Sequence, residues 1–500
     1  MTGVHLFSLI AVCILGGESA CQSRSDEMLP PSPATPPSPS PPAEPQRPLP
    51  TSVVCRDSIA PAIPSPHRTF YINAASGSDG ADGRTPQTAW RSLGKANAAA
   101  QPGDLFLLSG TFSHQLIHPA ESGLLDAKIV YRGMPGTIIS GGQYDVIVWL
   151  DGVSHIVVDG LELVNEGTAI AMRSGANNNW IRNVYAHDLG SVGVHLTAAI
   201  GNRIEDSRIE RVGNEDGNTG EGIFMQDGAN RNAIVRNTIR NAGHGALWIS
   251  YQNAAEATSD DNRVERNDLS NPWASGLGMN GKATRTIVQC NRIHDTADGR
   301  RVNYARAGVE VEGDGNIIRF NEIFRSGATG LTIQGRTSAG FIQNATNNRV
   351  YQNTFWENGR GGTGAESIQL IQKDVGDVRG NVIERNIFWH DTGLLADGPR
   401  YAVAADLYHA TVPWIPATTN GNVVRDNLFP TSQDLFLVIR SGPGNDAYSA
   451  VRAQSVLTGW TGNIQTDPLF VDEAAGDVRL QSQSVASKLG AYCTVDCIVQ

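Results

Sequence analysis

The chain has 500 residues, of which only 18% are charged, and its 39 basic and 50 acidic side chains give a net charge of −11. A chain with this balance lacks the positive field that holds a nucleic-acid backbone or an anionic membrane surface, so we exclude those partners. The 54 glycines and the scarcity of charge favour a turn-rich β protein over a helical one.

The N-terminal residues are expected to direct export. HLFSLIAVCILGG (5–17) is an apolar run too short to span a bilayer, which predicts a signal over residues 1–21. Cys21 also fits the lipidated cysteine of a bacterial lipoprotein, although Glu18 stands where such signals carry leucine. We expect residues 22–66 to form a Pro-rich, disordered linker. We therefore expect a secreted bacterial protein or an outer-membrane or cell-surface lipoprotein, attached to the membrane through Cys21 if this is lipidated.

The chain repeats itself from about residue 140. Segments such as RNTI (236–239) and RNIF (385–388) recur at steps of 24 to 33 residues, each followed by a Gly turn and a second alternating run such as GVHL (193–196). Period-two runs of this length indicate short strands, and a repeat of this length indicates a solenoid. The sequence therefore predicts an all-β, single-stranded parallel β-helix. One Asn per coil is expected to adopt left-handed backbone at a corner and to hydrogen-bond its equivalents in neighbouring coils.

The repeats also suggest boundaries. We expect a cap and first coils over 67–140, regular coils over 141–430, and final coils with a cysteine-containing tail over 431–500. The segments 70–112 and 467–480 resemble the opening and closing segments of secreted right-handed β-helix proteins of the pectate-lyase-like superfamily. That resemblance implies the right-handed fold. We expect a monomer.

The cysteines fit an oxidising compartment. Two of Cys55, Cys493 and Cys497 are expected to form a disulfide, and the sequence does not decide which two. Cys290 lies within the repeats, where we expect a small buried apolar side chain.

The stretch GVEVEGDG (308–315) carries the clearest chemical signal. On a strand, Glu310, Glu312 and Asp314 share one face at spacings of about 7 Å, where like charges repel. If the coils stack in register, Asn280 lies about 4.8 Å away in the preceding coil. Carboxylate and amide oxygens are the ligands that calcium prefers. The sequence therefore predicts a Ca²⁺ site made by these four side chains.

The alternative is that basic side chains neutralise the acids as ordinary surface pairs. Lys282, Arg306 and Arg336 are the candidates, and such pairs contribute little to stability.

The patch resembles polysaccharide lyase family 6, the chondroitinase B and alginate lyase type. The resemblance implies that Glu310, Glu312 and Asn280 hold calcium, which neutralises the uronate carboxylate. The family's Lys base follows the second Glu by a few residues, and the segment 313–321 has no lysine. The family's Arg in the following coil corresponds only loosely to Arg336.

These residues suggest a calcium-assisted lyase that cleaves an acidic, uronate-containing polysaccharide by β-elimination. Removing the proton next to a carboxylate needs a cation to absorb the charge that develops and a base to reach the carbon. Lys282 is the candidate base, and Arg336 is a co-base or a clamp on the carboxylate. The candidates for substrate binding are His244, Trp248, Arg306 and Phe224.

Two alternatives remain. The i, i+2 spacing of Glu310 and Glu312, or of Glu312 and Asp314, fits the carboxyl separation of about 6.5–9.5 Å in inverting glycoside hydrolases. A non-catalytic surface glycan-binding protein would instead use Trp248 and Phe224 as an exposed sugar platform. No P-loop, nucleophile elbow or HExxH motif occurs, which removes several large enzyme classes.

Overall fold

The computed structural model describes residues 62–142, 145–213, 220–250, 258–296, 307–338, 341–359, 367–372, 376–389, 403–406, 421–430, 437–441, 444–448, 454–455, 459–474 and 476–490. The predicted signal, Cys21, the linker up to residue 61 and Cys55, Cys493 and Cys497 lie outside these ranges. No helix within them has the length and apolarity that crossing a membrane requires.

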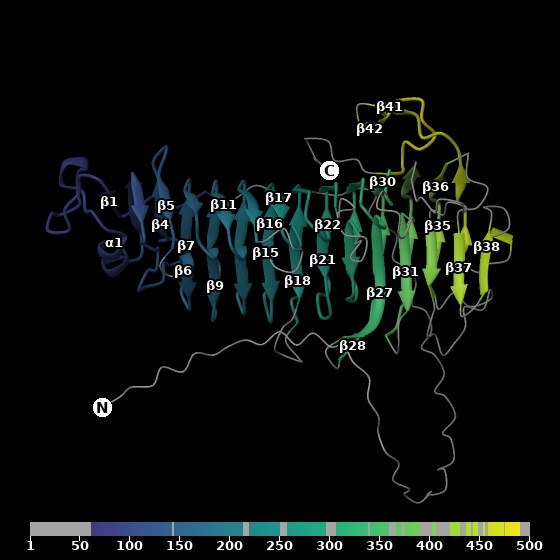
Figure 1. Cartoon of the computed structure of the whole chain (residues 1–500), viewed down its shortest axis with the longest axis horizontal. Helices are drawn as coiled ribbons and strands as arrows, with labels where there is room; N and C mark the ends of the chain where they lie inside the picture. The colour runs from purple at the N-terminus through teal and green to yellow at the C-terminus, as the bar shows by residue number, and fades with distance from the viewer. Residues whose placement is uncertain are drawn as a thin grey trace, which may run out of the picture. The chain divides into compact units, whose positions relative to one another are not determined.

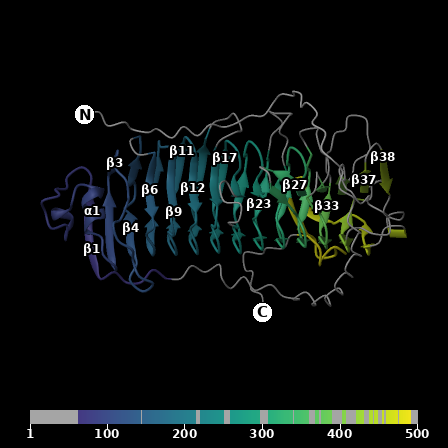
Figure 2. The ribbon, with the colours of Figure 1, turned by 90° about the horizontal axis from the view of Figure 1, so that it is seen from below.

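The described strands form three long sheets that run side by side along one axis (Figures 1 and 2). Sheet A comprises β1 (Arg68–Asn73), β2 (Asp104–Ser109), β4 (Ile129–Gly133), β7 (Ile156–Asp159), β10 (Trp180–Arg182), β13 (Arg203–Glu205), β16 (Ala233–Val235), β19 (Arg263–Glu265), β22 (Ile287–Gln289), β25 (Ile317–Arg319), β29 (Arg349–Tyr351), β32 (Val382–Glu384), β35 (Val423–Arg425) and β39 (Trp460–Thr461).

Sheet B comprises β3 (Thr111–Ser113), β5 (Ile138–Ser140), β8 (Glu162–Val164), β11 (Tyr185–Leu189), β14 (Arg208–Val212), β17 (Thr238–Ala242), β20 (Asp268–Ser270), β23 (Arg292–His294), β26 (Glu322–Phe324), β30 (Thr354–Trp356), β33 (Ile387–Trp389), β36 (Leu428–Phe429) and β40 (Ile464–Gln465).

Sheet C comprises β6 (Val146–Asp151), β9 (Thr168–Arg173), β12 (Val192–Thr197), β15 (Glu221–Gln226), β18 (Leu247–Ser250), β21 (Leu277–Met279), β24 (Val309–Val311), β27 (Leu331–Ser338), β31 (Ile368–Gln372), β34 (Val403–Asp406), β37 (Leu437–Ser441) and β38 (Gly444–Tyr448), with β28 (Phe341–Gln343) paired to β27. The pairs β27–β28 and β37–β38 are antiparallel, whereas the coil-to-coil pairs are parallel.

Each coil passes through sheets A, B and C in turn, which confirms the predicted parallel β-helix. The predicted register is also confirmed, because Leu277 pairs with Val309 and Met279 with Val311. Val309 and Val311 are fully buried, as are the equivalent apolar pairs of the neighbouring coils. Burial of these alternating side chains leaves the residues between them on the outer face of sheet C.

A short helix closes the N-terminal end of the core. The 3-10 turn η2 (Pro86–Thr88) precedes α1 (Leu93–Ala99), whose N-cap Ser92 accepts a hydrogen bond from the backbone N–H of Lys95 at 3.1 Å. Leu93 and Ala96 are fully buried in the main core. The helix therefore covers apolar side chains of the first coils; Figure 1 shows it at the N-terminal end of the sheets.

The predicted Asn ladder is present at the corner between sheets A and B. Its members are buried side chains that hydrogen-bond from coil to coil: Asn237, Asn267, Asn291, Asn321, Asn353, Asn386, Asn427 and Asn463. The predicted left-handed backbone at these asparagines is wrong. The preceding residue adopts it, as Arg266 does with φ 56°, and this turns the Asn side chain inward.

A second ladder, which the sequence analysis did not identify, lies between sheets C and A. It contains Asn179, Asn202, Asn232, Asn262, Asn316, Asn348, Asn381 and Asn422. Thr286 interrupts it between Asn262 and Asn316. Its hydroxyl is buried without a hydrogen-bond partner among the described residues.

Thr286→Asn is expected to stabilise the protein by about 1 kcal/mol, since asparagine restores the missing coil-to-coil hydrogen bonds at nearly unchanged volume. The measurement is the urea midpoint at constant slope. Thr286→Val, which removes the unsatisfied hydroxyl without restoring the ladder, is the matched control. A midpoint for Thr286→Asn at or below that of Thr286→Val contradicts the prediction.

The C-terminal segment returns along the outside of sheet B. β41 (Phe470–Asp472) and β42 (Asp477–Leu480) form an antiparallel pair that lies beside β30 and β36 in Figure 1. We call residues 470–490 the C-terminal strap. Its apolar side chains pack on an outward column of sheet B in one cluster: Phe324, Trp356, Ile387, Trp389, Leu428, Phe470, Val478, Ala486 and Leu489.

The prediction for Cys290 is wrong. Cys290 is disulfide-bonded rather than a simple buried apolar side chain. The other five cysteines lie outside the described residues, so the partner does too. Cys290 occupies the left-handed corner position of its coil, with φ 58°, and this position points its side chain away from the core.

Candidate functional site

The candidate site lies on the outer face of sheet C. In successive coils Phe224 pairs with Trp248, Trp248 with Gly278, and Gly278 with Glu310. The backbone N–H of Glu312 donates to the carbonyl of Met279 at 2.7 Å, which places Asn280 beside Glu312. The predicted juxtaposition of positions 280, 310 and 312 is therefore present.

Each predicted acidic residue has its own hydrogen-bond donor. Glu310 accepts from the hydroxyl of Ser275 at 2.6 Å. Glu312, only 2% exposed, accepts from the amide of Gln334 at 3.0 Å and pairs with Arg336 at 2.9 Å. These donors offset the repulsion that the neighbouring carboxylates of Glu310 and Glu312 would otherwise produce.

Asp314 faces a different part of the chain. It accepts hydrogen bonds from the backbone N–H of Thr346 at 2.7 Å and from the hydroxyl of the same residue at 2.8 Å. Its carboxylate therefore binds the turn of the following coil.

Asn280 carries an unsatisfied acceptor. Its Oδ1 atom is buried and accepts no hydrogen bond from any residue that the structure describes. A buried acceptor of this kind costs free energy unless a donor or a cation satisfies it.

The donor set fits calcium in kind. Asn280 Oδ1 and the carboxylates of Glu310 and Glu312 are hard oxygens from two neighbouring coils. Within the described ranges no three His, Cys, Asp or Glu side chains are grouped for a metal ion, so Asp314 does not complete a carboxylate cluster. A bound ion would therefore rest on the amide and the two glutamates.

Lys282 lies at the edge of this patch. It follows Gly281, which has φ 61°, in the turn after β21. A Cβ on Gly313 would lie 2.0 Å from the carbonyl oxygen of Ala283, so this turn packs directly against the residue after Glu312. Lys282 is half-buried, and its ammonium group forms no ion pair with any residue in the described part of the chain.

The alternative in which basic side chains neutralise the acids as ordinary surface pairs therefore holds for one of the three candidate residues. Arg336 pairs with Glu312, Lys282 pairs with no described residue, and Arg306 lies outside the described residues.

Arg336→Met is expected to cost about 2 kcal/mol of stability, because it keeps the apolar stem but leaves the buried Glu312 carboxylate without its cationic partner. Urea unfolding in the presence of chelator measures the loss. Adding Glu312→Gln to the same chain should recover most of it, since the buried charge is then removed as well. A double variant no more stable than Arg336→Met contradicts this account.

The expectation that Trp248 forms part of an exposed aromatic platform is wrong. Trp248 is 5% exposed and folds over Gly278 of the next coil, where a Cβ would lie 2.4 Å from its ring. The ring of His244 packs against it with centroids 4.5 Å apart. The glycine leaves the space that the indole fills, so the tryptophan is part of the packing of the face.

Phe224 and His244 have more specific neighbours. Phe224 is half-buried and stacks on His195, with centroids 5.2 Å apart and an interplanar angle of 13°. His244 Nδ1 lies 3.1 Å from Glu221 Oε1. The carboxylate of Glu221 therefore orients the ring of His244.

His195 was not among the predicted site residues. Burial and then the nearby charge of Arg173 lower the pKa of His195 to about 4, so its ring is neutral at physiological pH. It contacts Thr197 and Gln226 at 3.1 and 3.0 Å. Its alternation with the core pair Val194 and Leu196 is the sequence signal that places it on this face.

Comparisons with known proteins agree with this architecture. Residues 137–293 match the family model of the right handed beta helix region. No curated protein matches the sequence.

Three of the solved structures that match the chain have low sequence identity to it. PL6 family alginate lyase AlyGC has a TM-score of 0.54 and 16% identity, over 86% of this chain and 57% of that chain. An alginate lyase from Paenibacillus sp. str. FPU-7 has 0.43 and 18%, over 65% and 98% of the two chains. A GH136 lacto-N-biosidase from Eubacterium ramulus has 0.44 and 14%, over 80% and 68%. The sheet topology and the family match over residues 137–293 identify the fold of the chain as a right-handed parallel β-helix.

Proposed function

We propose that the protein acts on an acidic, uronate-containing polysaccharide at the outer face of sheet C, as a calcium-assisted lyase. The observation that carries the proposal is the buried, unsatisfied Oδ1 atom of Asn280 beside Glu312 and one strand from Glu310. The likeness of the fold to that of the alginate lyase AlyGC supports a polysaccharide as the substrate class.

The reaction requires three groups around one sugar. Calcium, held by Asn280, Glu310 and Glu312, supplies neutralisation of the uronate carboxylate when it is bound. Lys282 takes the proton from the carbon next to that carboxylate, and no ion pair with a described residue holds its ammonium group elsewhere.

The electron pair of the broken C–H bond forms a double bond to the neighbouring carbon, whose bond to the glycosidic oxygen breaks. His244, held by Glu221 at 3.1 Å, donates a proton to the leaving oxygen. Arg336 balances the charge of Glu312, and we assign to it the role of clamping the substrate carboxylate.

Non-catalytic glycan binding is the second candidate. The pairing of Arg336 with Glu312 favours it, because the buried carboxylate is already neutralised without a metal. The same pairing opposes an inverting hydrolase, in which Glu312 would have to take up or release a proton.

The test is a panel of alginate, pectate and chondroitin incubated with the purified protein in calcium or in chelator. Elimination produces a double bond conjugated with the carboxylate, so near-ultraviolet absorbance that rises only with calcium supports the proposal. New reducing ends without absorbance indicate hydrolysis. Binding in gel retardation without either product indicates a glycan-binding protein, and both of these results overturn the lyase proposal.

A further inference from the structure

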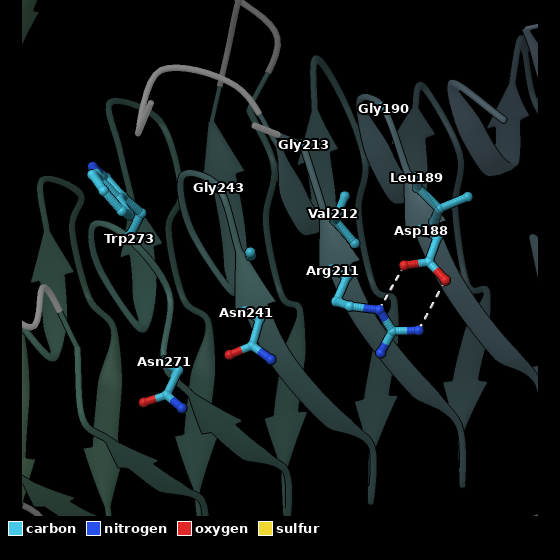
Figure 3. A pocket seen from close by; sticks show the side chains of 11 residues that line it. Asp188, Leu189, Gly190, Arg211, Val212, Gly213, Asn241, Gly243, Asn271 and Trp273 are labelled. Carbon is cyan, nitrogen blue, oxygen red and sulfur yellow. Dashed lines mark hydrogen bonds and ion pairs between the residues drawn. The ribbon is translucent and has the colours of Figure 1, made fainter. Parts of the chain in front are cut away.

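A hollow lies away from the patch on sheet C, at the corner where sheet B strands end and the chain turns towards sheet C. It has a volume of about 620 Å³ and spans four successive coils (Figure 3). Its lining comes from the ends of β11, β14, β17 and β20 and the residues after them: Asp188, Leu189, Gly190, Arg211, Val212, Gly213, Asn241, Ala242, Gly243, Asn271 and Trp273.

The floor of this hollow is made of glycine. Gly213, Gly243 and Trp273 occupy equivalent positions in successive coils. The backbone N–H of each donates to a carbonyl oxygen of the preceding coil, at 2.7, 2.7 and 2.8 Å, and this carbonyl always belongs to the residue just before the equivalent position. Gly190 is the equivalent residue one coil before Gly213. Three coils therefore place no side chain here, and in the fourth an indole rises and closes the hollow at one end (Figure 3).

Packing does not require the first of these glycines. A Cβ on Gly190 would meet its nearest atoms, in Gly167 and Glu166, at 3.8 and 3.9 Å, which is ordinary contact. The space above Gly190 is therefore open rather than filled by neighbouring atoms.

The rim is a column of polar side chains. Asp188, Arg211, Asn241 and Asn271 all adopt left-handed backbone, with φ of 55°, 54°, 54° and 51°. This conformation directs four side chains of successive coils to the same edge, at steps of about 4.8 Å. The exposed amides of Asn241 and Asn271 make no hydrogen bond to any residue that the structure describes.

The charges at the rim cancel. Arg211 binds Asp188 through two hydrogen bonds, at 2.6 and 2.9 Å. The hydrogen bonds from Arg211, and then that from His187, hold the pKa of Asp188 well below its usual range, so the pair stays ionised and mutually neutral. An anionic ligand meets no spare positive charge in this hollow.

We propose that this hollow binds an uncharged oligosaccharide. The indole of Trp273 offers an apolar wall for one face of a sugar ring, and the amides of Asn241 and Asn271 offer donors and acceptors to hydroxyl groups. The paired Asp188 and Arg211 supply further acceptors and donors without selecting for charge. A few polar groups around an apolar wall in a hollow of this size are typical of a small-molecule site.

This site is separate from the face proposed to cleave uronates. Its lining residues belong to the sheet B corner, and it shares no residue with the patch around Glu312. A protein with both sites would hold a neutral polysaccharide at the corner while it acts on an acidic one at sheet C.

The experiment uses calorimetric titration of the full chain with cellohexaose, xylohexaose, mannohexaose and maltohexaose. At least one should bind, and Trp273→Ala should weaken it at least 10-fold. The pair Asn241→Gly and Asn271→Gly, which keeps the left-handed backbone free of strain, should do the same.

Gly190→Tyr fills the hollow without touching Trp273 and should abolish binding. Gly80→Tyr is the matched control, because a Cβ there meets only Ser78 Oγ at 3.8 Å and lies outside the hollow. Glu312→Ala should leave hexasaccharide binding unchanged, which keeps this test independent of the lyase proposal. Binding by none of the four hexasaccharides, or equal binding by wild type, Trp273→Ala and Gly190→Tyr, overturns the inference.

Discussion

Lys282→Ala should abolish polysaccharide cleavage, by at least about 100-fold in rate, while calcium binding stays intact. The reason is the separation of roles on sheet C, where the lysine lies in the turn after β21 and contributes no oxygen ligand. Calcium binding is measured by calorimetry, and cleavage by near-ultraviolet absorbance on the best substrate of the panel.

Glu312→Ala gives the complementary result. It should lose both calcium binding and cleavage, because the buried carboxylate is the ligand next to Asn280. Lys128→Ala is the matched lysine control, since Lys128 is buried beside Trp180 at the N-terminal part of sheet A. If Lys282→Ala retains wild-type cleavage, the base is another group.

Asn321→Ala is expected to destabilise the protein by about 3 kcal/mol or more. Its Oδ1 atom accepts from both the backbone and the amide of Asn291, at 2.9 Å each. Its amide donates to Asn353 Oδ1 and to the carbonyl of Val288, at 3.0 Å each. Alanine leaves several buried groups unsatisfied, each costing about 1–3 kcal/mol. The measurement is the urea midpoint.

Asn271→Gly is the control for Asn321→Ala. This asparagine is exposed, and its φ of 51° suits glycine, so its loss should stay below about 1 kcal/mol. Equal midpoints for the two variants would mean that the ladder contributes no more than a surface asparagine.

The fold could be predicted because each coil of a parallel β-helix repeats the same short sequence pattern. Alternating apolar pairs such as Val309 and Val311 fix both the inward face and the register, since a slip of one residue would expose them. The position of Asn280 beside Glu312 follows from that register alone. The second Asn ladder was missed because its members follow the sheet C strands, where turn lengths vary from coil to coil.

The side-chain partners could not be read in the same way. The contact of Asp314 with Thr346 depends on the rotamer chosen in a turn, which alternation does not determine. The burial of Trp248 depends on the absence of a side chain at Gly278. The hollow beside Trp273 arises from glycines far apart in the sequence, and only the stacking of coils brings them into one floor.

The C-terminal strap changes how the stack of coils unfolds. A stack in which every coil contacts only its two neighbours can unfold from its end, one coil after another. Here Phe470 and Leu489 of the strap pack across coils that include Phe324, Trp356 and Trp389. The coils under the strap cannot unfold one at a time while the strap is in place. That part of the stack therefore unfolds as a single unit.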